Sequence, residues 1–174
     1  KPVEKKEKKG GGCFPVKDGR FAVEGAEPHD IYYMAGSTSE DMAPPFIFDM
    51  ARDWCVRQTK QGKQTSYCWF FDRKLPGDKN GAWHSSDLWY WFGTLENCWR
   101  PMEQKDYDLS EQMVSYLTNF AKCGDPNSSP LPMWEASRPT SRRVLRIGEK
   151  PTHMGRVNGI RLALSSLWDT ITRQ

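Results

Sequence analysis

The sequence predicts an α/β protein whose β-sheet is incomplete. Apolar runs typical of buried strands alternate with segments of helical spacing, in the order strand, helix, strand, helix, strand, helix. Three predicted strands are fewer than the about five or six of an average sheet. We therefore expect a thin sheet with an apolar, open edge, as in one part of a larger fold.

The predicted elements begin after a tail. Residues 1–13 are rich in lysine and glycine and are predicted to be a solvated tail or linker, which leaves 14–174 as the folded part. Residues 30–36 form a continuous apolar run and are predicted as a buried strand. Residues 46–58 carry apolar side chains on one helical face. Residues 65–71 form the second apolar run and are the second predicted strand.

The second half of the chain continues this alternation. Residues 107–123 have apolar side chains at helical spacing, and Gly124 is a natural helix stop. Residues 143–147 alternate between charged and apolar side chains, which is typical of an edge strand. Residues 156–171 are predicted as the last helix because their apolar side chains again share one helical face.

Charge and hydropathy exclude several classes of function. The net charge is +3, with 25 Lys and Arg against 22 Asp and Glu. Five lysines and two glutamates among the first twelve residues account for all of it, so the rest of the chain is neutral overall. Nucleic-acid binding would need a basic patch on the folded part, and none is predicted. No apolar run approaches the about 20 residues of a membrane-spanning helix, so no membrane span is expected.

The cysteines favour a reducing compartment such as the cytoplasm. The five cysteines are widely spaced, and their odd number leaves at least one thiol unpaired within the chain. Residues 1–13 lack the apolar run of a secretory signal peptide. The cysteine spacing typical of zinc sites is absent, and we expect neither a metal nor a cofactor.

A histidine and two acidic residues follow the first two predicted strands. His84 lies in a glycine-rich loop after the second strand, where a histidine could act as a general base. Glu40 and Asp41 follow the first strand. Because the carboxyl ends of parallel strands share one edge of a sheet, one of these acids could orient His84 and stabilise its protonated form. A structural alternative is that Asp41 caps the helix of residues 46–58.

The nucleophile that such a base would serve is not evident. The G-x-S-x-G motif of a serine nucleophile is absent, and the segment GSTSE at 36–40 resembles it without the second glycine. An oxyanion motif of the H-G-G-G type is also absent, since the three glycines at 10–12 follow a lysine in the tail. The sequence thus holds two thirds of a nucleophile–histidine–acid triad, in the chain order acid, then histidine.

Several segments carry a more specific resemblance. They are PVKDG at 15–19, GSTSED at 36–41, FFDRKLPGD at 70–78, GAWHSSDLWYWFGTL at 81–95, LTNFAKCGDPN at 117–127 and LPMW at 131–134. In this order they resemble the C-terminal third of type-B carboxylesterases, which include para-nitrobenzyl esterases and cholinesterase-like proteins. The resemblance covers nearly the whole chain. It implies the C-terminal portion of an α/β-hydrolase fold and hydrolysis of small carboxylic esters by a Ser–His–acid triad.

The resemblance implies roles for individual residues. It places the catalytic histidine at His84 and the triad acid at Asp41. Glu40 is the alternative acid, because the order of the two acids is inverted here and Met42 replaces a glycine of the family pattern. Asp87 would hold the histidine loop. The serine and the oxyanion hole would come from the N-terminal part of the same enzyme as a partner, so the chain is expected to be a fragment that is inactive alone.

A non-catalytic binding or structural module is the alternative function. It would keep the strands and the aromatic side chains but would not need His84 to contact an acid. The tryptophans near this histidine could then line a gorge or, more commonly, pack in the core; they are Trp83, Trp89 and Trp91. His29 and His153 are expected to be exposed and uninvolved, and Cys68 to be a buried apolar residue.

Overall fold

The computed structural model describes residues 16–17, 20–21, 29–79 and 81–158. An open, mixed β-sheet lies between the helices of this structure. Within these residues the sheet has four strands in the order β3-β4-β5-β6. They are β3 (Tyr33–Thr38), β4 (Ser66–Phe71), β5 (Arg143–Ile147) and β6 (His153–Arg156). The first three strands run parallel, and β6 runs antiparallel to β5.

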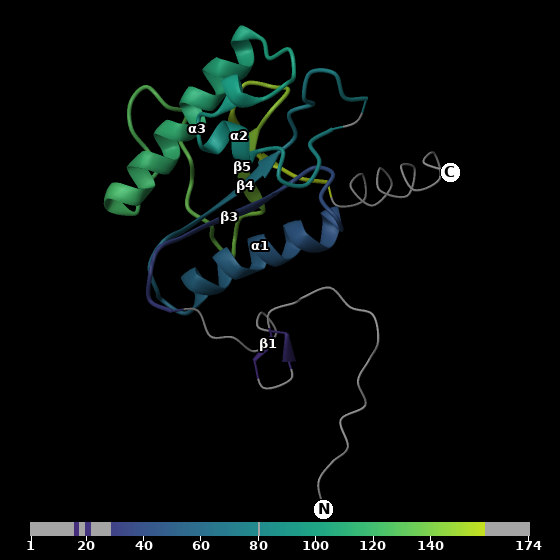
Figure 1. Cartoon of the computed structure of the whole chain (residues 1–174). Helices are drawn as coiled ribbons and strands as arrows, with labels where there is room; N and C mark the ends of the chain where they lie inside the picture. Colours follow the sequence, from purple (N-terminus) through teal and green to yellow (C-terminus); the bar gives the residue numbers. More distant parts are fainter. Residues whose placement is uncertain (1–15, 18–19, 22–28, 80, 159–174) are drawn as a thin grey trace, which may run out of the picture.

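Helices cover both faces of this sheet (Figure 1). The helix α1 (Pro44–Lys60) lies on one face and contacts β3 and β4. The short α2 (Leu88–Trp91) and the long α3 (Gln104–Cys123) lie together on the other face. A 3-10 turn (Leu95–Asn97) connects them. The hairpin strands β1 (Val16–Lys17) and β2 (Arg20–Phe21) pair only with each other among the described residues.

The alternation of side chains along β4 fills two apolar cores. Tyr67 and Phe71 point to the face covered by α2 and α3, where they join the larger core. Cys68 and Phe70 point to the opposite face and pack against α1. Because nearly every residue of β4 is buried, the strand is a continuous apolar run, as expected of a parallel strand covered on both faces.

Most predicted elements are present with shifted ends. Two prolines occupy the first turn of α1, where their missing N–H groups cost no hydrogen bond, and Ala43 is its N-cap. The expectation that Asp41 could cap this helix is therefore wrong. The helix α3 begins three residues earlier than predicted, because Glu103 and Asp106 form a reciprocal capping box. It ends at Gly124, as predicted.

Two predictions about the sheet need correction. The described sheet has four strands instead of three, because β6 returns antiparallel after a short turn. Residues 143–147 were expected at the edge, but β5 lies between β4 and β6. The predicted last helix began at Arg156, which belongs to β6, and its residues 159–171 lie outside the described residues. The tail at 1–13 also lies outside them.

Candidate catalytic site

Two loops run side by side beyond the carboxyl ends of β3 and β4. These strands are in register, with Thr38 opposite Phe71. The first loop continues the pairing, since the Ser39 N–H donates to the Phe71 carbonyl at 2.8 Å. The Glu40 N–H then donates to the Ala82 carbonyl at 2.7 Å, and Glu40 forms a parallel bridge with Trp83. The sheet edge thus extends into the two loops that hold the predicted residues.

Two side chains of the first loop, Ser39 and Glu40, accept hydrogen bonds from the backbone of the second loop. The Gly81 N–H donates to Glu40 Oε1 at 2.6 Å, and the Ala82 N–H donates to Ser39 Oγ at 3.0 Å. A Cβ atom on Gly81 would lie only 2.7 Å from Ser39 Oγ and 3.0 Å from Glu40 Oε1. Any other residue at this position would therefore displace the Ser39 and Glu40 side chains that bind the second loop.

His84 and Asp41 meet one residue beyond this bridge. His84 Nδ1 lies 2.7 Å from Asp41 Oδ1. The distance is that of a charge-assisted hydrogen bond, in which the Nδ1–H donates to the carboxylate. Asp41 Oδ1 also accepts the Met42 N–H at 2.8 Å, and Thr38 Oγ1 lies 3.5 Å from Oδ2. These contacts fix the carboxylate on the side that faces the imidazole.

The two side chains differ sharply in their exposure. The Asp41 side chain is only 9% exposed, whereas the His84 side chain is 55% exposed. With Nδ1 bonded to the acid, the neutral imidazole carries its lone pair on Nε2. This nitrogen is therefore the one that can accept a proton from a group outside the described residues. The arrangement can support general-base chemistry.

The turn after His84 is stabilised by a backbone hydrogen bond and by the buried Asp87. Ser85 adopts a left-handed conformation with φ 68°, and the Ser86 N–H donates to the Trp83 carbonyl at 3.0 Å. Asp87 is buried and accepts the Trp91 Nε1–H at 3.1 Å. Burial raises the pKa of Asp87, because the charged form is poorly solvated there. Asp87 thus packs in the core beneath the turn, and among the hydrogen bonds of the described residues none joins it to His84.

A row of tryptophans lies beside the histidine loop. Trp83 and Trp89 are half-buried and pack edge to face with centroids 5.9 Å apart, and Trp89 packs in the same way on Trp99 at 5.5 Å. Trp99 is 77% exposed, and Arg100 stacks on its ring. Trp91 is buried in the core. The sequence did not predict Trp99 in this row, because its position follows from the turn between α2 and α3.

The remaining predicted residues lie apart from this site. His29 and His153 are exposed, as expected, and His153 belongs to β6. Cys68 is buried, as expected. Among the described residues, no group of three or more His, Cys, Asp or Glu side chains could hold a metal ion. No helix in the described part of the chain is long and apolar enough to cross a membrane.

Comparison with known sequences identifies relatives. The sequence model of the Carboxylesterase family matches residues 26–163. Bile salt-activated lipase of Rattus norvegicus is 32% identical over 114 residues, which are 63% of this chain and 19% of that protein. Acetylcholinesterase of Gallus gallus is 24% identical over 127 residues, or 70% of this chain and 16% of that protein. The chain thus spans about a fifth of the length of these relatives.

Solved structures show the same fold. A thermophilic PNB esterase matches 63% of this chain and 23% of its own, with a TM-score of 0.55 and 22% identity. A second PNB esterase matches with a TM-score of 0.53 and 21% identity. These matches confirm the predicted fold class, a portion of an α/β-hydrolase fold. Since the family model covers most of the sequence, the chain belongs to the carboxylesterase family.

Proposed function

We propose that the chain contributes the histidine and the acid of a serine carboxylesterase. The observation that carries the proposal is the 2.7 Å contact between His84 Nδ1 and Asp41 Oδ1. It lies beyond the carboxyl ends of two parallel strands, where catalytic groups of open α/β folds gather. The relatives include a lipase and a cholinesterase by name, which supports a carboxylic ester as the substrate class.

In the proposed reaction, His84 moves the protons. A serine outside these 174 residues attacks the ester carbonyl while His84 Nε2 takes the serine proton. The imidazolium then gives this proton to the departing alcohol, and an acyl-enzyme remains. Water attacks the acyl group with His84 again as the base, and the returned proton restores the serine as the acid leaves. Asp41 keeps the proton on Nδ1 and stabilises the imidazolium by its charge.

We assign the triad acid to Asp41 and a positioning role to Glu40. The Glu40 carboxylate accepts the Gly81 N–H, so it connects the two loops instead of facing the imidazole. Asp41 is the carboxylate within hydrogen-bond distance of His84 Nδ1 among the described residues. The proposal therefore predicts different kinetic consequences for the two acids.

The test measures hydrolysis of p-nitrophenyl acetate. The 174-residue chain alone is expected to be inactive, because the serine and the oxyanion hole are proposed to lie in a segment outside it. In the protein that joins this chain to that segment, His84→Ala should lower kcat by about 10⁶-fold and Asp41→Asn by about 10⁴-fold, since triad members act as a unit. His29→Gln is the matched control, because this exposed histidine lies before β3, at the opposite end of the strand from the candidate site.

Three outcomes would contradict the proposal. Hydrolysis by the 174-residue chain with burst kinetics that depend on His84 would show that the nucleophile is inside the chain. A larger loss for Glu40→Gln than for Asp41→Asn would show that the acid is assigned wrongly. An Asp41→Asn variant that folds normally and retains full activity in the joined protein would favour the non-catalytic interpretation of this contact.

A further inference from the structure

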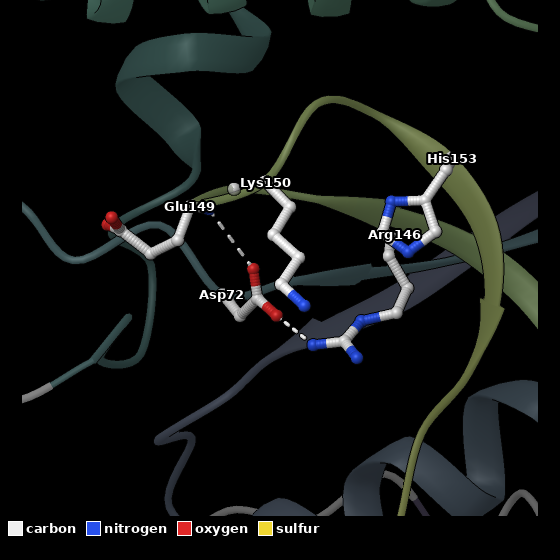
Figure 2. Close-up of a pocket in the computed structure, with 6 residues that line it drawn as sticks. Asp72, Arg146, Glu149, Lys150 and His153 are labelled. Atoms are coloured by element: carbon white, nitrogen blue, oxygen red, sulfur yellow. Dashed lines mark hydrogen bonds and ion pairs between the residues drawn. The ribbon is translucent and has the colours of Figure 1, made fainter.

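A pocket lies at the turn between β5 and β6, outside the candidate catalytic site. Its volume is about 160 Å³, and its lining includes Asp72, Arg146, Lys150 and His153 (Figure 2). A cavity of about 150 Å³ can hold a molecule the size of benzene, so this pocket has room for a small ligand. The family resemblance gives no role to these side chains.

The sheet itself fixes two of the basic side chains. Arg146 of β5 and His153 of β6 are direct partners in the antiparallel pair, so both side chains project from the same face. Arg146 Nη2 pairs with Asp72 Oδ2, and the guanidinium lies 5.7 Å from the Phe70 ring centroid. His153 Nδ1 lies 2.7 Å from the Pro151 carbonyl, to which its N–H donates. The pocket wall is therefore preorganised before any ligand binds.

One donor of this wall has no acceptor. Arg146 Nε is buried and has no hydrogen-bond partner among the described residues. A buried donor without a partner is costly, and such a group indicates a missing acceptor. Lys150 comes from the turn and points between Asp72 and Arg146 in Figure 2. Two cationic side chains thus face the same small space.

The negative charges near the pocket are already engaged. Glu149 turns away, because its Oε1 accepts Arg73 Nη1 and the Lys74 N–H, both at 2.7 Å. Asp72 is the single remaining carboxylate of the pocket lining, and it is held by Arg146. Asp72 pairs with Arg146 and Glu149 with Arg73, so Lys150 is the charged side chain of this lining that has no ion pair among the described residues.

A glycine lets the turn approach the end of β4. Gly148 has φ 155°, and a Cβ atom there would lie 2.2 Å from Asp72 Oδ1 and 2.5 Å from the Arg73 nitrogen. Any side chain at this position would displace Asp72 and open the wall that it shares with Arg146. The close approach of the turn is thus what encloses the pocket on this side.

We propose that this pocket binds a small oxyanion, such as a phosphate or carboxylate group, between Arg146 and Lys150. The oxyanion would accept the unpaired Arg146 Nε–H and a hydrogen bond from Lys150 Nζ, and it would offset the charge of the Lys150 ammonium. Asp72 holds the guanidinium through its contact with Nη2. The proposal concerns residues separate from His84 and Asp41 and does not depend on the esterase function.

The test is calorimetric titration of inorganic phosphate into the 174-residue chain. Lys150 is exposed on a turn, so Lys150→Gln removes one ligand bond without disturbing the core. Losing one charge-assisted hydrogen bond should raise the Kd about tenfold. Lys150→Arg keeps the charge and the donors and should retain the affinity. Lys122→Gln, an equal charge change at the exposed end of α3, is the matched control and should leave the Kd unchanged.

Three results would overturn the proposal. Phosphate could fail to bind the folded parent chain, or Lys150→Gln could change the Kd no more than Lys122→Gln does. Binding to phosphatidylglycerol vesicles that depends on Lys150, without binding of free phosphate, would show that the basic groups recognise a lipid surface instead of a small anion. Circular dichroism of each variant verifies that a change in affinity does not come from unfolding.

Discussion

The buried ion pair between Arg73 and Asp106 should be the costliest polar contact of the described structure to break. Asp106 is fully buried and accepts three hydrogen bonds: from Arg73 Nε at 2.7 Å, from the Tyr90 hydroxyl at 2.8 Å and from the Glu103 N–H at 3.0 Å. Arg73 is only 6% exposed. Asp106→Ala removes both carboxylate oxygens and with them all three hydrogen bonds, and among the described residues it leaves the Arg73 guanidinium with only the half-exposed Glu149.

The expected loss of stability is large. Removing one partner of a buried ion pair costs about 3–5 kcal/mol, because the other charge stays buried and unpaired. Loss of the capping box adds about 1 kcal/mol. Total stabilities of domains are about 5–15 kcal/mol, so the variant should be close to unfolding at room temperature. Urea denaturation followed by circular dichroism measures the difference in the free energy of unfolding.

The same contact predicts a pH dependence. Burial tends to raise the pKa of Asp106, but the bonds from Arg73, Glu103 and Tyr90 outweigh it and lower this pKa below its ordinary value. A lowered pKa in the folded state means that the contribution is present above the unfolded value of about 3.9. It is lost as the pH falls below this value, through the folded pKa. Parent and variant should therefore converge in stability on acidification.

Asp108→Ala is the control for this experiment. Asp108 lies on the same helix but is exposed, and it accepts a hydrogen bond from the exposed Gln104 side chain. Its removal should change the free energy of unfolding by about 0.5 kcal/mol or less. A loss below about 1 kcal/mol for Asp106→Ala, similar to that of Asp108→Ala, would refute the reasoning. The buried pair would then not hold the end of β4 against α3.

Two further predictions concern the turn after His84. Because Ser85 has φ 68°, Ser85→Gly should leave the free energy of unfolding within about 1 kcal/mol of the parent. Ser85→Val should lower this free energy by about 1–3 kcal/mol, because a branched side chain is strained in this backbone conformation. Urea denaturation measures both values, and equal effects of the two variants would contradict this account. Because burial raises the pKa of Asp87, Asp87→Asn should increase the free energy of unfolding at pH 7. The asparagine keeps a side-chain oxygen that can accept the Trp91 Nε1–H. The gain should shrink as the pH falls through the pKa of Asp87 in the folded state, because the parent then carries a neutral carboxyl group too. A less stable Asp87→Asn variant at pH 7 would contradict it.

Local patterns in the sequence were sufficient to predict the strands and helices that bury one or both of their faces. The apolar run that became β4 and the spacing of apolar residues in α3 fix those elements, because burial there does not depend on which neighbour covers them. The edge position predicted for β5 failed for the opposite reason. A strand is interior or peripheral according to its neighbours, and β6 is a short strand that contains a glycine and has little apolar character of its own.

Local sequence patterns also predicted only part of the candidate site. The sequence could place His84 and two acids beyond neighbouring strands, but it could not decide which acid faces the histidine. That choice follows from the bridge between Glu40 and Trp83, which brings the next residue of each loop together. The anchoring contacts of Ser39 and Gly81 have no sequence pattern of their own. They arise only when the two loops pair.

The pairing of these loops also explains how an aspartate reaches the histidine. Residues next to each other in an extended segment point to opposite sides, so Glu40 and Asp41 cannot both face His84. The aspartate side chain is short, so the two loops must lie close together for Asp41 to reach His84 Nδ1. The absence of a side chain at Gly81 permits this approach, and the bonds from Gly81 to Glu40 and from Ala82 to Ser39 hold it. The two acids therefore have different structural roles. Glu40 holds the two loops together through its hydrogen bond to Gly81, and Asp41 makes the contact with His84 that this loop spacing allows.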